Sequence, residues 1–175
     1  GSNGPLAEVN SHDIDTLHWY AGSEALEVYA IAGNYRSEGA RESHPDFYDN
    51  VTMTVRFANG VQGLVQGAQG VRYGYDSRCE VLGENGLLTV GELPYNSARS
   101  YTQQGIGGSI VPSWRNLFEP AYLAEDMDFV DCIREGRAPR AGAREGLEAL
   151  KVVVAGNRSI RERRPVRLDE IEETP

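Results

Sequence analysis

The stretch NVTMTVRFANGVQGLVQGAQ, residues 50–69, sets the architecture of the chain. Apolar and polar side chains alternate through residues 50–58, which predicts a strand with one buried face. Asn59-Gly60 follows directly and predicts a hairpin with a type I′ turn, which needs positive φ at both positions. Residues 61–69 are then the returning strand. The centre of the sheet is therefore expected to be antiparallel.

Other parts of the chain extend this sheet. Tight turns separate most of its strands, as is typical of antiparallel pairing. Between them, polar and glycine-rich stretches at 33–48 and 92–113 predict loops. The predicted strands cover residues 26–32, 77–82, 87–90 and, as a short edge strand, 166–168.

Two long helices complete the predicted fold. Apolar residues recur every three to four positions over 114–135, which Gly136 ends, and over 143–163. The prediction is an α+β protein of two layers: a mainly antiparallel open sheet with helices on one face. Its other face, expected to carry valine and methionine, is predicted to meet a second subunit.

Near the start of the chain, residues 8–15 read EVNSHDID. Asn10 or Ser11 is expected to cap a short helix that an extended segment enters and that Gly22 ends. His12 then lies in the first turn, with Glu8 four residues earlier. Because histidine titrates near neutral pH, the two can act as a proton-handling pair facing one cavity. The alternative is that His12 only caps the helix and is satisfied by a backbone carbonyl.

Composition excludes several functions. A net charge of -9 argues against a nucleic-acid partner, because binding phosphates requires basic patches. No apolar run is long enough to span a bilayer, and no signal peptide is recognisable, so a cytoplasmic protein is expected. The two cysteines and three histidines lack the spacing of metal ligands. Glycines at 60, 63, 67 and 70 do not form a GxGxxG phosphate loop.

Several segments together resemble the second domain of the Gfo/Idh/MocA oxidoreductases, most closely that of inositol 2-dehydrogenases. The first is a carboxylate followed, after three residues, by His-x-x-Asp. The others lie in the middle and the last two helices, and together they cover most of the chain. The matching segments are Glu8 with His12-Asp13-Ile14-Asp15, residues 73–86, Trp114 to Phe129, residues 134–139, residues 145–147 and residues 157–159.

The resemblance implies an enzyme of two domains, of which residues 1–168 would be the second and residues 169–175 an acidic tail. The first, a Rossmann domain that binds NAD or NADP, has no counterpart here, since no strand–GxGxxG–helix unit is present. Lys151 lies in the last predicted helix and not in the family's Glu-Lys-Pro motif. The chain alone is therefore not expected to transfer hydride or to bind the dinucleotide. A homo-oligomer, dimer or tetramer, is expected through the open sheet face.

The resemblance also assigns roles to residues. His12 would be the acid/base that takes the proton of a polyol or sugar hydroxyl, and Glu8, which is aspartate in many relatives, would orient it. Asn10 and Tyr73 would contact the substrate, although a tyrosine in a sheet is more often a packing residue. The identity of the polyol and the choice between NAD and NADP stay open. A module for self-association or ligand binding, without catalysis, is the alternative function.

Overall fold

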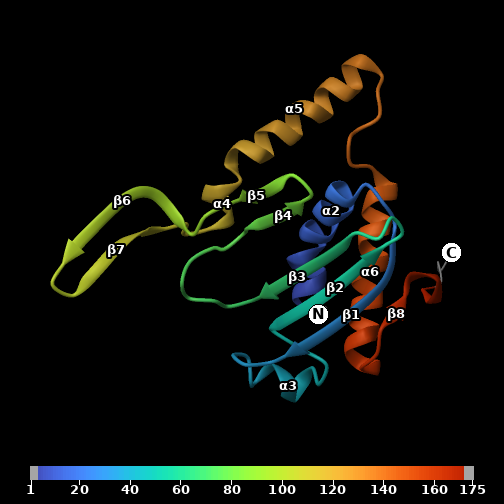
Figure 1. Cartoon of the computed structure of the whole chain (residues 1–175), viewed down its shortest axis with the longest axis horizontal. Helices are drawn as coiled ribbons and strands as arrows, with labels where there is room; N and C mark the ends of the chain where they lie inside the picture. Colours follow the sequence, from blue (N-terminus) through green and yellow to red (C-terminus); the bar gives the residue numbers. More distant parts are fainter. Residues whose placement is uncertain (1–3, 172–175) are drawn as a thin grey trace. The chain divides into compact units, whose positions relative to one another are not determined.

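A computed structural model describes residues 4–171 of the chain (Figure 1). The chain divides into two compact units. The first combines the two ends of the sequence, up to Gly70 and from Ala141, and contains a sheet with its covering helices. The second, Val71–Arg140, contains two hairpins and a long helix.

The sheet of the first unit has four antiparallel strands in the order β3-β2-β1-β8. The predicted hairpin is present, but its turn is not type I′. Gly60 has a φ of 88°, but the φ of Asn59 is not positive. Only the second of the two turn positions is therefore left-handed. The bounds are β1 (Ala25–Gly33), β2 (Asn50–Phe57), β3 (Gln62–Ala68) and β8 (Val166–Arg167).

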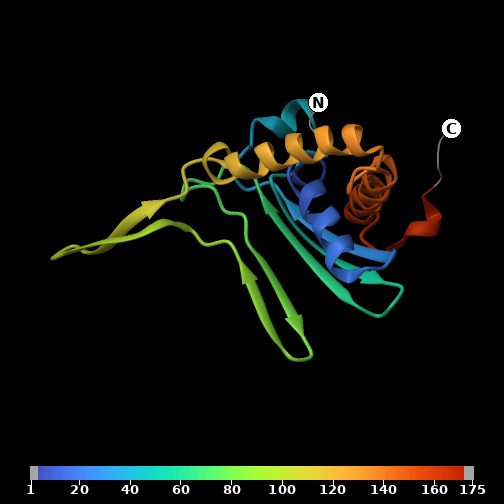
Figure 2. The same ribbon diagram turned by 90° about the horizontal axis from the view of Figure 1, so that it is seen from above.

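Helices α1 (Pro5–Glu8), α2 (Asn10–Ala21) and α6 (Ala143–Glu162) pack on one face of this sheet (Figure 2). The core between the layers contains buried side chains from β2 that point toward the helices. Gly156 of α6 allows a close approach, because a Cβ there would lie 2.8 Å from both Leu6 Cδ1 and Met53 Sδ. The β2 side chains in this core are Val51, Met53, Val55 and Phe57.

The open face therefore differs from the prediction. Valine and methionine of β2 lie on the covered face, and the uncovered face carries the alternate residues of the three long strands. Tyr29, Ile31 and Leu64 are its exposed apolar side chains, at 41%, 58% and 57% exposure. This error follows from period-two alternation, in which the apolar set of a strand faces the helices.

The start of the chain also differs from the prediction. Residues 5–8 form a helix instead of an extended segment, with Pro5 in its first turn. Val9, with φ of -119° and ψ of -53°, joins α1 to α2 and takes the N-cap position expected for Asn10 or Ser11. The C-terminal prediction is confirmed, since Gly22 is left-handed at φ 58° and its N–H binds the His18 carbonyl.

The connection from β1 to β2 contains a short helix, α3 (Ala40–Ser43), within a predicted loop. Its first part is held by Asp49, which is 2% exposed. The carboxylate of Asp49 accepts hydrogen bonds from the backbone N–H groups of Tyr35, Arg36 and Ser37 at 2.8–3.0 Å. One buried side chain thus fixes the path of the loop.

At the other end of the chain, η1 (Leu168–Glu170) is a 3₁₀ turn. It includes the first two residues of the acidic tail predicted over 169–175. The Arg164 guanidinium donates to both oxygens of Glu170, at 2.7 and 3.1 Å. Ile171 packs against the core of the first unit. Residues 172–175 lie outside the described residues.

The second unit corrects three predictions. The strands expected at 77–82 and 87–90 do not extend the main sheet but pair with each other in a separate two-stranded sheet. Residues 92–113 were expected to be a loop but contain a hairpin of β6 (Pro94–Thr102) and β7 (Gly105–Ile110). The helix expected over 114–135 is interrupted at Phe118, because Pro120 in the first turn of the second helix has no N–H to continue the first. The remaining bounds are β4 (Cys79–Gly83), β5 (Gly86–Val90), α4 (Trp114–Leu117) and α5 (Glu119–Glu135).

Candidate functional site

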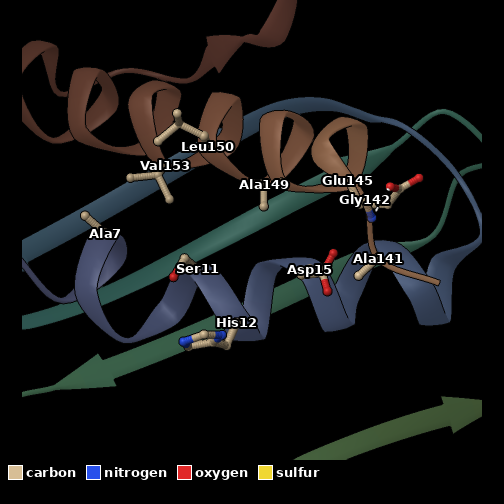
Figure 3. Close-up of a pocket in the computed structure, with 11 residues that line it drawn as sticks. Ala7, Ser11, His12, Asp15, Ala141, Gly142, Glu145, Ala149, Leu150 and Val153 are labelled. Carbon is tan, nitrogen blue, oxygen red and sulfur yellow. Dashed lines mark hydrogen bonds between the residues drawn. The ribbon is translucent and has the colours of Figure 1, made fainter. Parts of the chain in front are cut away.

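A groove of about 410 Å³ lies between the first two helices and α6 (Figure 3). All of its lining residues belong to the first unit. Ser11, His12 and Asp15 of α2 lie along one side, and the first turns of α6 lie along the other. The complete lining is Ala7, Ser11, His12, Asp15, Ala141, Gly142, Glu145, Gly146, Ala149, Leu150 and Val153.

The walls of the groove are apolar, and its polar groups are few. Ala7, Ala149 and Val153 supply methyl groups, while a hydroxyl, an imidazole and two carboxylates supply the polar atoms. Glu145 is already engaged, because its carboxylate accepts the Gly142 N–H at 2.7 Å. Backbone N–H donors at the start of α6, from Glu145 itself and from Gly142, lower the pKa of this carboxyl. His12 is left as the only imidazole in the lining.

His12 is the third residue of α2, as expected, and its side chain is exposed. Within residues 4–171, its ring makes no hydrogen bond or ion pair to another residue. His12 therefore lacks the bond to a backbone carbonyl that the alternative reading expected. His18 has such a contact, since its Nδ1 lies 3.0 Å from the Ile14 carbonyl. The His12 imidazole is thus exposed at the rim of the groove. Its ring lies on the side of α2 away from α6, whereas Ser11 and Asp15 point toward α6 (Figure 3).

Glu8 is exposed at the end of α1, one helical turn before His12. In the described part of the chain, no hydrogen bond or ion pair joins its carboxylate to the imidazole. An orienting role for Glu8 stays a prediction.

Asn10 lies on the sheet side of α2 and is 1% exposed. Its Nδ2 donates to Asp13 Oδ2 at 2.7 Å and to the Gln66 carbonyl of β3 at 3.3 Å. The predicted contact with substrate is untested, but these bonds aim the amide at the sheet, and Asn10 is absent from the groove lining.

Tyr73 belongs to the second unit, where its side chain is 52% exposed. Its hydroxyl donates to Asp76 Oδ2 at 3.2 Å. Arg78 binds the same carboxylate through two nitrogens, at 2.6 and 2.8 Å. Hydrogen bonds from Arg78 lower the pKa of Asp76, and partial burial together with the charge of Asp76 raises the pKa of Tyr73. The role of Tyr73 toward substrate stays a prediction.

Sequence reasoning missed three polar residues that share the groove with His12. Ser11 was considered only as a helix cap. Asp15 was named only within the segment that resembles the family and was given no role in the site, although it lies three residues after His12 and therefore on a neighbouring face of the helix. Glu145 lies 133 positions after His12, and no local signal links the two. Among residues 4–171, no cluster of histidine, cysteine, aspartate or glutamate could hold a metal ion. The same residues include no helix long and apolar enough to cross a membrane.

Comparison with known proteins identifies relatives of this domain. Residues 2–168 match the family model described as "Oxidoreductase family, C-terminal alpha/beta domain". Inositol 2-dehydrogenase 2 of Paenarthrobacter aurescens is 33% identical over 159 residues, which cover 89% of this chain and 46% of that protein. The NAD(+)-dependent scyllo-inositol 2-dehydrogenase of Bacillus subtilis is 28% identical over 96% of this chain and 48% of its own length.

Solved structures agree with the fold described above. The myo-inositol dehydrogenase of Corynebacterium glutamicum superposes with a TM-score of 0.88 at 26% identity, over 96% of this chain and 50% of that one. The mixed fold with its antiparallel open sheet is thus confirmed as that of the C-terminal domain of such proteins. The chain spans about half the length of the relatives it matches.

Proposed function

Because the chain belongs to the Gfo/Idh/MocA oxidoreductase family through its C-terminal alpha/beta domain, we propose that it is the substrate-side half of a dehydrogenase acting on a polyol. The substrate would be an inositol or a related sugar alcohol, oxidised at one CH–OH group to a ketone. We propose this substrate class because the two relatives compared above are inositol dehydrogenases.

In this proposal His12 is the acid/base. Its imidazole would accept the hydroxyl proton of the substrate while the carbon loses hydride, since a neutral imidazole is a competent base near pH 7. Ser11 and Asp15 beside it could hold neighbouring hydroxyls by hydrogen bonds, and the apolar walls would exclude water. Glu8 and Tyr73 keep the supporting roles that the resemblance assigns to them.

A nicotinamide dinucleotide would supply the hydride acceptor. Within the described residues, no glycine-rich turn leads from a strand into a helix to cradle a pyrophosphate. We assign none of these residues to the cofactor, and the choice between NAD and NADP stays open.

One observation carries the proposal: an exposed imidazole that no residue of 4–171 binds lies on the rim of a groove, in the Glu-x-x-x-His-x-x-Asp arrangement of residues 8–15. A histidine that served only the helix would be expected to bond a carbonyl, as His18 does.

The test uses the whole protein that contains this chain and measures oxidation of myo- and scyllo-inositol with NAD and with NADP. His12→Ala is expected to lower kcat by about 10²–10⁴-fold, the usual contribution of a general base. His44→Ala is the matched control, because His44 is exposed and contacts only Ser43 Oγ through its ring. Wild-type turnover in His12→Ala would refute the role of His12.

We also propose that the domain self-associates through the open face of its sheet, as a dimer or tetramer. Tyr29, Ile31 and Leu64 give this face exposed apolar side chains without a covering helix. Self-association without catalysis remains the second candidate function, and inactivity of the whole wild-type protein toward polyols would favour it.

A further inference from the structure

We propose that Asn10 is a positioning residue for His12 and not a substrate contact. Its buried amide anchors the first turn of α2 to β3 and so fixes where the imidazole is held. The inference rests on the acid/base role proposed for His12.

The contacts of Asn10 span the helix and the sheet. Its Nδ2 donates to the Gln66 carbonyl at 3.3 Å, across 56 positions of sequence, and to Asp13 Oδ2 at 2.7 Å. Asn10 precedes His12 by two residues and Asp13 follows it by one, so the amide links the two side chains that flank His12 in sequence and joins them to the backbone of β3. The buried amide bonds β3, while His12 is exposed at the rim of the groove.

The oxygen of the Asn10 amide, Oδ1, explains why β3 has glycine at position 67. A Cβ at Gly67 would overlap Asn10 Oδ1, so only glycine leaves room for this side chain. Oδ1 is buried and, within the described residues, has no hydrogen-bond partner. A residue that merely filled this space would not need an amide, because an unpaired buried oxygen is unfavourable. The side chain is thus explained by the two bonds that Nδ2 donates.

Asn10 ties the start of α2 to the sheet by a hydrogen bond that no other described side chain of the helix makes. Val9 is the N-cap and supplies no side-chain hydrogen bond, and the bond from Thr16 Oγ1 to the His12 carbonyl stays within the helix. Without the amide, no side-chain hydrogen bond among the described residues would join the turn that carries His12 to β3. A displacement of about 1 Å at a catalytic group can lower a rate on the order of 10²-fold.

The experiment compares Asn10→Ala, Gly67→Ala and the double variant in the whole protein, with polyol oxidation and thermal unfolding as readouts. In the double variant, the methyl group added at position 67 occupies space that the amide vacates. We expect its Tm to exceed that of either single variant, because packing is restored. We expect its kcat to stay at least about tenfold below wild type with KM little changed, because the anchor is still missing.

Ser159→Ala is the control for lost stability. Its Oγ accepts from the Ala30 N–H and donates to the Arg164 carbonyl, at 3.0 and 2.6 Å, so its loss should lower Tm without lowering kcat. Wild-type kcat in Asn10→Ala, or recovery of kcat together with Tm in the double variant, would overturn the inference. If His12→Ala retains full activity, the function proposed for His12 has failed instead, so the two failures can be told apart.

Discussion

At the scale of single residues, Asp49 shows how one side chain sets a loop and its response to acid. Burial alone would raise the pKa of this carboxyl, but the N–H groups of Tyr35, Arg36 and Ser37 and the charge of Arg36 together hold the pKa below its usual value. Because the folded pKa is lowered, its stabilising contribution is complete above about pH 4, the unfolded pKa. That contribution is lost as pH falls through the folded pKa.

Asp49→Asn should therefore lower the free energy of unfolding by about 1–3 kcal/mol at pH 7, since hydrogen bonds to a charged acceptor are lost. The difference from wild type should shrink as the pH falls below about 4. Urea unfolding at several pH values measures both effects. Asp46→Asn, at an exposed position of the same loop, is the control and should match wild type. A deficit that does not change with pH would contradict this account of Asp49.

Residue-scale prediction from sequence succeeded where the cause is local. Gly22 and Gly136 end their helices in the left-handed region as expected, because that conformation depends on the residue itself. The prediction that Asn59 has positive φ was wrong, because a single left-handed glycine, Gly60, was enough to close the hairpin. The setting of Asn10 was beyond sequence reasoning, since Gln66 and Gly67 approach it only through the tertiary fold.

At the scale of elements, alternation gave β2 and β3 nearly residue by residue, because one side of each strand meets the helices. The hairpin of β6 and β7 was missed because both of its faces are exposed and its sequence carries no alternating apolar signal. Likewise, apolar spacing indicated a helix over 114–135, of which α5 is the longer part, but it did not identify a buried face: Tyr122, Phe129 and Ile133 are exposed.

The open face of the sheet gives an element-scale prediction. If Tyr29, Ile31 and Leu64 form a contact between copies, Ile31→Lys or Leu64→Lys should shift the protein to a smaller species, because lysine would bury a charge there. Light scattering coupled to gel filtration measures the mass. Val61→Lys, an exposed apolar position beside the hairpin turn, is the control and should leave the mass unchanged. A wild-type chain that is monomeric at all concentrations would contradict the proposed interface.

At the scale of the whole molecule, the two units differ in how much core they contain. Among the described residues, Val111 and Cys132 are the buried side chains of the second unit, and all the others belong to the first. Protection of an amide from exchange requires opening of packed structure, so it follows the core. In a dilute solution of this chain, the amides of β1 and β2 should exchange with deuterium far more slowly than those of β6 and β7. Hydrogen exchange followed by mass spectrometry measures this, and equal protection of the two pairs would mean that other contacts stabilise the second unit.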